Sequence, residues 1–177
     1  MSQEYRFFEH AVPLEMEKAF IERLDQYRKV AQYMKGSDTV LDVGCSSGYG
    51  ARVLNDCTVY HGVDQEKESI EYAKANYGRF PNLHFHWNKA LTFLKRVPNR
   101  HYDVVICLDM LHENPGMERE ILEELVRVCN RELFIAVRET PEFRMLDAHE
   151  IIRRRKPEMD YRELLSGKVP LHSVTRI

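Results

Sequence analysis

Residues 39–50, Thr-Val-Leu-Asp-Val-Gly-Cys-Ser-Ser-Gly-Tyr-Gly, constrain the fold of this chain more than any other segment. Their first half is mostly apolar and predicts a buried strand, which a tight glycine turn and a helical pattern follow. In such a unit, the carboxyl end of the strand opens into a small-molecule site. Gly44 and Gly48 leave no side chain where a ligand must approach the backbone.

An acidic residue at the end of the next predicted strand supports a ligand site. Asp64 follows Val63 and stands twenty residues after Gly44, a distance at which a carboxylate suits the two hydroxyl groups of a ribose. Asp64 can also serve as the N-cap of the helix predicted after it. Asp42, two residues before the first glycine, can hold an amino group directly or through water. We therefore expect the chain to bind a nucleoside-bearing cofactor.

Strands and helices alternate along the chain. The predicted strands are 39–43, 58–63, 83–86, 102–108 and 132–137, and the predicted helices are 14–34, 47–55, 66–77, 89–96 and 117–128. Continuous apolar strands between helices are typical of a parallel sheet covered on both faces. The expected fold class is α/β, with a single-domain, doubly wound, mostly parallel sheet and helices on both faces. Right-handed crossovers then bring Gly44, Asp64 and Leu108 to one edge of the sheet.

The length of the chain bounds its domain organisation. A chain of 177 residues is long enough for one domain with a full core, and no internal repeat or linker divides it. We expect an N-terminal helical cap over residues 1–37, a cofactor-binding core over 38–140 and a C-terminal segment over 141–177.

Composition and charge argue against several classes of protein. With 44% hydrophobic and 31% charged residues, the chain is typical of a soluble globular protein. Its net charge of −2 provides no field that recruits nucleic acid or an anionic membrane, and no stretch approaches the roughly 20 apolar residues of a membrane span. The first ten residues lack the apolar region of a signal peptide, and the four cysteines show no Cys-x-x-Cys spacing. We expect reduced thiols and a cytoplasmic location.

The order of the glycines separates two classes of nucleoside cofactor. Dinucleotide-binding folds use Gly-x-Gly-x-x-Gly, with a pyrophosphate at the helix N-terminus. Here the glycines fall at positions 44, 48 and 50, so the first close pair is missing. Asp42 also places a carboxylate near the turn, where its negative charge would not stabilise a bound pyrophosphate. A nicotinamide-dependent oxidoreductase is therefore the least favoured interpretation.

Four segments together resemble the class I S-adenosylmethionine-dependent methyltransferases. Residues 41–48, Leu-Asp-Val-Gly-Cys-Ser-Ser-Gly, are similar to the first motif of that family, with Ser46 in place of its middle glycine. The other three segments are Val63-Asp64, Tyr102–His112, and residues 121–126 together with 133–136. The resemblance covers residues 24–140 and implies a class I methyltransferase-like Rossmann fold. It also implies S-adenosylmethionine as cofactor and S-adenosylhomocysteine as product.

The resemblance implies a set of cofactor-binding residues: Tyr27, Asp42, Gly44, Cys45, Ser46, Gly48, Asp64, Gln65, Asn88, Lys89 and Leu108. The chain departs from the family at residues 88–90, because Asn-Lys-Ala replaces the common Gly-Asp-Ala that holds the adenine amino group. The amide oxygen of Asn88 can accept that hydrogen bond, whereas Lys89 cannot.

The C-terminal segment also departs from the family and is shortened relative to it. Residues 142–156 and 160–165 are expected to be helical, and residues 168–176 to form one strand. Most family members end in a two-stranded hairpin at this place. The substrate side is therefore expected to be trimmed, completed by a partner subunit or absent from this chain.

Three polar residues after the strand at 102–108 are candidates for catalysis. His112 stands where the methyl group is expected to point, and a neutral imidazole there can take a proton from a hydroxyl or amine. Asp109 and Glu113 can do the same or orient the substrate. An exposed or structural role remains the alternative for His112.

No metal is expected. His84 and His86 lie two residues apart and share a strand face, but the sequence offers no third ligand for them. Residues 138–140, Arg-Glu-Thr, also differ from the acids that metal-dependent methyltransferases carry there.

The function expected first is methyl transfer to an oxygen or nitrogen atom of a small molecule, with sugar-type metabolites among the candidates. The alternatives are an RNA or protein methyltransferase and a non-catalytic S-adenosylmethionine-binding partner subunit. The charge argues against nucleic acid, and residues 108–111, Leu-Asp-Met-Leu, replace the Asn-Pro-Pro-Tyr type of tetrapeptide that amino-methylating members carry. A homodimer and a partner subunit both stay open.

Overall fold

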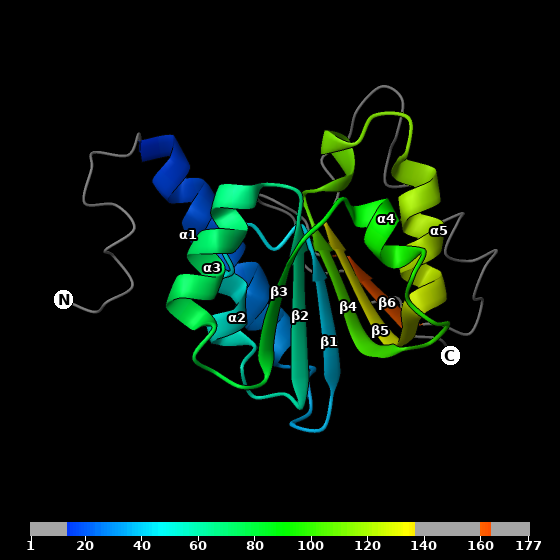
Figure 1. The fold of residues 1–177 in the computed structure, drawn as a ribbon, viewed down its shortest axis with the longest axis horizontal. Coiled ribbons are helices and arrows are strands. Elements are labelled where there is room, and N and C mark those ends of the chain that lie inside the picture. Colours follow the sequence, from blue (N-terminus) through cyan, green and yellow to red (C-terminus); the bar gives the residue numbers. More distant parts are fainter. Residues whose placement is uncertain (1–13, 137–159, 164–177) are drawn as a thin grey trace.

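The computed structural model describes the backbone of residues 14–136 and 160–163 and the side chains of residues 21–136. A six-stranded sheet, with strand order β3-β2-β1-β4-β5-β6, forms the centre of the molecule (Figure 1). Every adjacent pair of these strands is parallel. The strands are β1 (Thr39–Val43), β2 (Val59–Asp64), β3 (Leu83–Trp87), β4 (Tyr102–Leu108), β5 (Cys129–Ala136) and β6 (Asp160–Glu163).

Helices cover the sheet on both faces (Figure 1). They are α1 (Leu14–Ala31), α2 (Tyr49–Val53), α3 (Lys67–Tyr77), α4 (Ala90–Leu94) and α5 (Glu118–Val128), with a short 3₁₀ helix, η2 (Leu111–Glu113), after β4. The two faces carry separate hydrophobic clusters because strand side chains alternate in direction. Tyr27, Leu54 and Ile70 from α1 to α3 pack on one face, whereas Leu94 and Leu122 from α4 and α5 pack on the other.

The strand order reverses between β1 and β4, which are hydrogen-bonded neighbours flanked by β2 and β5. In a doubly wound sheet, the crevice outside the carboxyl ends of the strands at such a reversal is where ligands bind. The segments after β1, β2, β3 and β4 all emerge at this edge. The predicted α/β fold, doubly wound with helices on both faces, is therefore confirmed.

The structure agrees with most of the predicted elements and corrects one. The strands at 39–43 and 102–108 match to the residue, and the five predicted helices are present with shorter ends. The helix predicted over 160–165 is wrong, because residues 160–163 form β6 beside β5. Pairing with a strand already in place outweighs the weak local preference of four residues. The predictions for 142–156 and 168–176 lie outside the described residues.

In the described part of the chain, no helix is long and apolar enough to cross a membrane.

A cluster of histidines covers the β2–β3 end of the face that carries α4. The His61 ring lies 5.2 Å from that of His84 and 5.0 Å from that of His86, measured between centroids. His61 Nδ1 lies 2.7 Å from the Tyr102 hydroxyl. His86 Nε2 is buried without a hydrogen-bond partner. His61 supplies the third imidazole that the sequence did not place beside His84 and His86.

This cluster predicts a loss of stability in acid. Burial and the neighbouring histidines lower the pKa of His61 from 6.5 to about 4. The unfolded chain therefore binds the proton first, and the free energy of unfolding falls as the pH drops from about 6.5 towards 4. We expect His61 to contribute about 1–2 kcal/mol to this loss, allowing for its partial exposure. Urea unfolding at pH 7 and pH 4.5 measures it, and an equal acid loss in His61→Gln would contradict the assignment.

Candidate functional site

The glycine turn after β1 is held by the end of β2. The backbone amides of Gly44 and Cys45 donate hydrogen bonds of 2.8 and 3.2 Å to the carbonyl of Val63. Gly44 has a φ of +84°, Ser46 a φ of +49° and Gly48 a φ of +76°, so the turn passes three times through the left-handed region that suits glycine. Ser46 occupies the position of the family's middle glycine and adopts a glycine-like conformation.

Asp64 joins this turn to the start of α3. Its Oδ2 accepts a hydrogen bond of 2.7 Å from the Ser46 amide, and its Oδ1 accepts one of 2.9 Å from the Glu66 amide. The helix begins after Glu66 as N-cap, so Asp64 bonds the residue before the helix and is not itself the cap. A carboxylate offers about four acceptor positions, so Asp64 is fixed in orientation and can still accept ligand hydroxyls.

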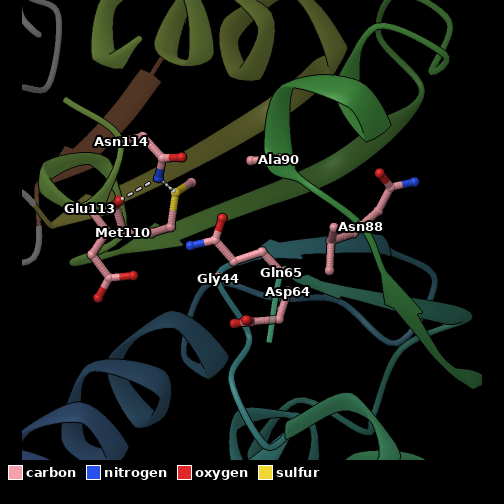
Figure 2. Close-up of a pocket in the computed structure, with 9 residues that line it drawn as sticks. Gly44, Asp64, Gln65, Asn88, Ala90, Met110, Glu113 and Asn114 are labelled. Atoms are coloured by element: carbon pink, nitrogen blue, oxygen red, sulfur yellow. Dashed lines mark hydrogen bonds between the residues drawn. The ribbon is translucent and has the colours of Figure 1, made fainter. Parts of the chain in front are cut away.

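One pocket gathers several of the predicted residues at the carboxyl edge (Figure 2). Nine residues line it: Gly44, Val63, Asp64, Gln65, Asn88, Ala90, Met110, Glu113 and Asn114. Strand ends supply the residues near Asp64, and the segment around η2 supplies the opposite wall (Figure 2). Of the residues predicted for the site, Gly44, Asp64, Gln65, Asn88 and Glu113 are therefore brought together.

Asp42 lies beneath the turn and is fully buried. Its Oδ2 accepts hydrogen bonds of 2.8 Å from the Tyr27 hydroxyl and 2.7 Å from the Tyr60 hydroxyl. Its Oδ1 is buried without a hydrogen-bond partner. Burial raises the pKa of Asp42 from 3.8 to about 6, against the opposing effect of the two tyrosine hydroxyls and the charge of Arg23. The carboxylate is therefore held firmly through one oxygen, and its other oxygen is buried without a hydrogen bond.

Arg23 reaches from α1 to the end of β4. Its guanidinium donates hydrogen bonds of 3.0 Å to the Leu108 carbonyl and 3.1 Å to Asp109 Oδ2. Asp109 is buried, has a φ of +54° and leaves its Oδ1 without a partner. Arg23 also interacts electrostatically with Asp42. The two aspartates and the arginine therefore form one charged group at the β1–β4 end of the edge.

Other predicted residues lie elsewhere. The Cys45 side chain is buried in the sheet, where its Sγ lies 2.8 Å from the position that a Cβ on Gly62 would take. A Cβ on Gly48 would lie 2.7 Å from the Phe85 ring, and the φ of Gly48 is +76°, so core packing and backbone conformation both require a glycine there. Lys89 is exposed and borders a second hollow beside Trp87. His112 is not among the residues that line the pocket of Figure 2.

Within the described ranges, no group of three or more His, Cys, Asp or Glu side chains is arranged so that it could hold a metal ion, the cluster of His61, His84 and His86 included.

The comparisons with known proteins agree with this geometry. A family model described as "Methyltransferase domain" matches residues 40–132, which is more than half of the chain. The chain belongs to the methyltransferase domain family. The resemblance to class I S-adenosylmethionine-dependent methyltransferases is thereby confirmed at the level of the family. The matched range begins in β1 and ends in β5, so it contains the glycine turn, Asp64 and the whole pocket.

Several solved structures share the fold. The structure is similar to magnesium protoporphyrin IX methyltransferase (ChlM) from Synechocystis PCC 6803 with bound SAM, with a TM-score of 0.68 and 16% identity over 85% of this chain and 77% of that one. For the YcgJ protein from Bacillus subtilis, the TM-score is 0.53 and the identity 25%, over 61% of this chain and 46% of that one. For the [4+2]-cyclase SpnF, the TM-score is 0.60 and the identity 20%, over 76% of this chain and 57% of that one.

This chain thus spans about half the length of YcgJ and SpnF. No curated protein matches the sequence significantly. The name of SpnF also shows that members of one fold can carry different chemistries.

The residues of the site that the sequence did not predict include Arg23, Tyr60, Met110 and Asn114. The sequence pattern could have indicated Arg23, because it precedes Tyr27 by one helical turn and so shares a helix face with it. Tyr60 could also have been expected, because a buried Asp42 requires hydrogen-bond donors. Nothing in the sequence indicated Met110 or Asn114, since only the path of the backbone after β4 brings them over Gly44.

Proposed function

We propose that this chain binds S-adenosylmethionine across the carboxyl ends of β1, β2 and β4 and transfers its methyl group to an oxygen or nitrogen atom of a small molecule, with sugars among the acceptors to test. The observation that supports this most is the pair of buried carboxylate oxygens without a partner, Asp42 Oδ1 and Asp109 Oδ1. Buried acceptors are nearly always satisfied in folded proteins. A ligand ammonium group would satisfy them.

The residues present fit the remaining parts of the cofactor. Asp64 has a fixed carboxylate with acceptor positions to spare for ribose hydroxyls. Asn88 lines the same pocket and carries an amide oxygen that can accept from an adenine amino group. The departure from the family's Gly-Asp-Ala thus keeps an acceptor near the pocket.

When bound, the cofactor supplies a methyl group on a sulfonium sulfur, which is already activated for in-line displacement. The task of the protein is therefore to align the acceptor and to exclude water. Arg23, from α1, and η2 flank the end of β4 and can limit access of water to it. A base is needed only when the acceptor must lose a proton. His112 and Glu113 are adjacent in sequence, and of the two Glu113 lines the pocket, so both are candidates for this base.

Calorimetric titration tests the cofactor. We expect heat of binding with S-adenosylmethionine and S-adenosylhomocysteine and none with NAD. Binding of neither sulfur compound would overturn the proposal. A radiolabelled methyl screen over pooled small metabolites, RNA and protein then identifies the acceptor, and label confined to RNA or protein would reject the small-molecule assignment.

The buried Asp42 predicts a pH dependence of cofactor affinity. Because its pKa is raised to about 6, the carboxylate is neutral below that pH and no longer attracts a ligand ammonium. We expect the affinity for S-adenosylhomocysteine to be about tenfold weaker at pH 5 than at pH 7. The matched control is 5′-methylthioadenosine, which lacks the ammonium and should bind equally at both pH values. Equal pH slopes for the two ligands would contradict this role of Asp42.

Two replacements separate the candidate bases. His112→Ala is expected to leave cofactor binding unchanged and, if the imidazole takes the proton, to slow transfer by about 10²–10⁴-fold. Glu113→Gln is the matched comparison, because Glu113 lines the pocket and His112 does not. Single-turnover rates with saturating cofactor measure both. An unchanged rate removes that residue from the mechanism.

A further inference from the structure

The hollow that the nine pocket residues line is small and partly open to solvent. Its volume is about 20 Å³, which is room for about one water molecule. A nucleoside is many times larger, so the walls must move before one can enter. On the strand-end side, Val63 and Asp64 belong to β2 and are held in the sheet, so movement is left to the side chains around them, among them Gln65 and Met110.

Met110 is the side chain that closes this wall over the turn. It is buried, with 7% exposed, and its Cβ and Cγ lie 2.7 and 2.8 Å from the point where a Cβ on Gly44 would stand. In Figure 2 the Gln65 side chain is directed toward Met110 from the opposite side of the pocket, and the Met110 sulfur turns toward Asn114. Met110 therefore occupies the space directly beside the glycine turn.

Asn114 holds Met110 in this place. Its Nδ2 lies 2.9 Å from Met110 Sδ and 3.1 Å from the Met110 carbonyl oxygen, as the dashed lines of Figure 2 show. The carbonyl contact fixes the backbone of η2. The sulfur contact directs the flexible end of the side chain, and a thioether is only a weak acceptor. The hold on the side chain is therefore easily broken.

We propose that Met110, held by Asn114, is a gate that must swing out before a nucleoside cofactor enters the crevice. This inference rests on the proposed function of the same site. Methionine suits such a role, because it is unbranched and has three rotatable bonds. The gate lowers the apparent affinity by the fraction of molecules in which it is open. Removing the gate should therefore speed association without adding a contact.

The chain contains a single tryptophan, Trp87, and that residue can report the binding. Trp87 is exposed and donates a hydrogen bond of 2.9 Å from its indole to the carbonyl of Gln65, which lines the pocket. Stopped-flow tryptophan fluorescence with S-adenosylhomocysteine therefore measures association and dissociation rates. For an open population of about 10%, Met110→Ala is expected to raise the association rate about tenfold.

Two further variants define the result. Asn114→Ala removes the hold and keeps the methionine, and it should raise the association rate in the same direction even if Met110→Ala folds poorly. Met117→Ala is the matched control, because Met117 is exposed and lies outside the pocket. It should leave both rates unchanged. Circular dichroism checks that each variant is folded.

The outcomes distinguish the gate from the cofactor proposal. If the unmodified chain binds and the two variants associate no faster, the gate is overturned and the cofactor proposal stands. If Met110→Ala and Asn114→Ala instead dissociate faster with unchanged association, Met110 is a contact of the bound ligand and not a gate. If the unmodified chain and all variants fail to bind, both proposals fail together.

Discussion

Gly44→Ala is expected to lower the free energy of unfolding by about 2–4 kcal/mol. Two costs combine at this position. The φ of +84° disfavours any residue with a Cβ by about 1–2 kcal/mol. The new methyl group would also stand 2.7 Å from the Met110 Cβ, and overpacking of this kind adds about 1–3 kcal/mol. Urea unfolding measures the sum.

A second glycine separates the two costs. Gly116 has a φ of +82°, and a Cβ there would have no atom within 4 Å. Gly116→Ala should therefore show the conformational cost alone, and the difference between the two variants gives the cost of the contact. Met110→Ala keeps the Cβ at 2.7 Å and removes only the Cγ contact at 2.8 Å, so in the double variant Gly44→Ala should lose only part of that difference. If both glycine variants lose the same free energy of unfolding, Met110 moves aside without a measurable cost.

Asp64→Ala is expected to weaken S-adenosylhomocysteine binding by about 1–3 kcal/mol, which is roughly 5- to 150-fold. The carboxylate is proposed to accept the ribose hydroxyls, and it also fixes the Ser46 and Glu66 amides. Its removal therefore takes away a ligand contact and loosens the turn that the ligand rests on. Calorimetric titration measures the loss of affinity.

Asp64→Asn is the matched control for the turn. An amide retains one acceptor oxygen for a backbone amide and lacks the charge and the second acceptor. We expect an affinity between those of the unmodified chain and Asp64→Ala. If Asp64→Ala binds as well as the unmodified chain, the ribose does not lie at the end of β2.

The sequence was most informative where local pattern and tertiary environment agree. The strands at 39–43 and 102–108 are buried on both faces, so their apolar runs mark them without reference to the rest of the chain. The turn after β1 and Asp64 follow from the same pattern, because parallel strands place their carboxyl ends at one edge. This is why Gly44 and Asp64 could be placed at one edge of the sheet from the pattern, whereas Asn88 was assigned through the resemblance to the family.

The sequence was least informative where a contact depends on three-dimensional pairing alone. Arg23 is 86 positions from Asp109 along the chain, and no periodicity connects them. The strand at 160–163 exists because β5 offers an edge to pair with. Met110 belongs to an apolar stretch that is equally consistent with core packing, and only its approach to Gly44 distinguishes it.

Helix α1 touches the edge of the sheet twice, through Tyr27 on Asp42 and Arg23 on the end of β4. It precedes the first strand and belongs to none of the strand-helix units that build the sheet. Detachment of this one helix would expose Asp42 to solvent and return the pKa of its carboxyl group towards its ordinary value. Recognition of a charged ligand and the docking of α1 are therefore thermodynamically coupled, so a ligand that uses Asp42 also anchors the helix.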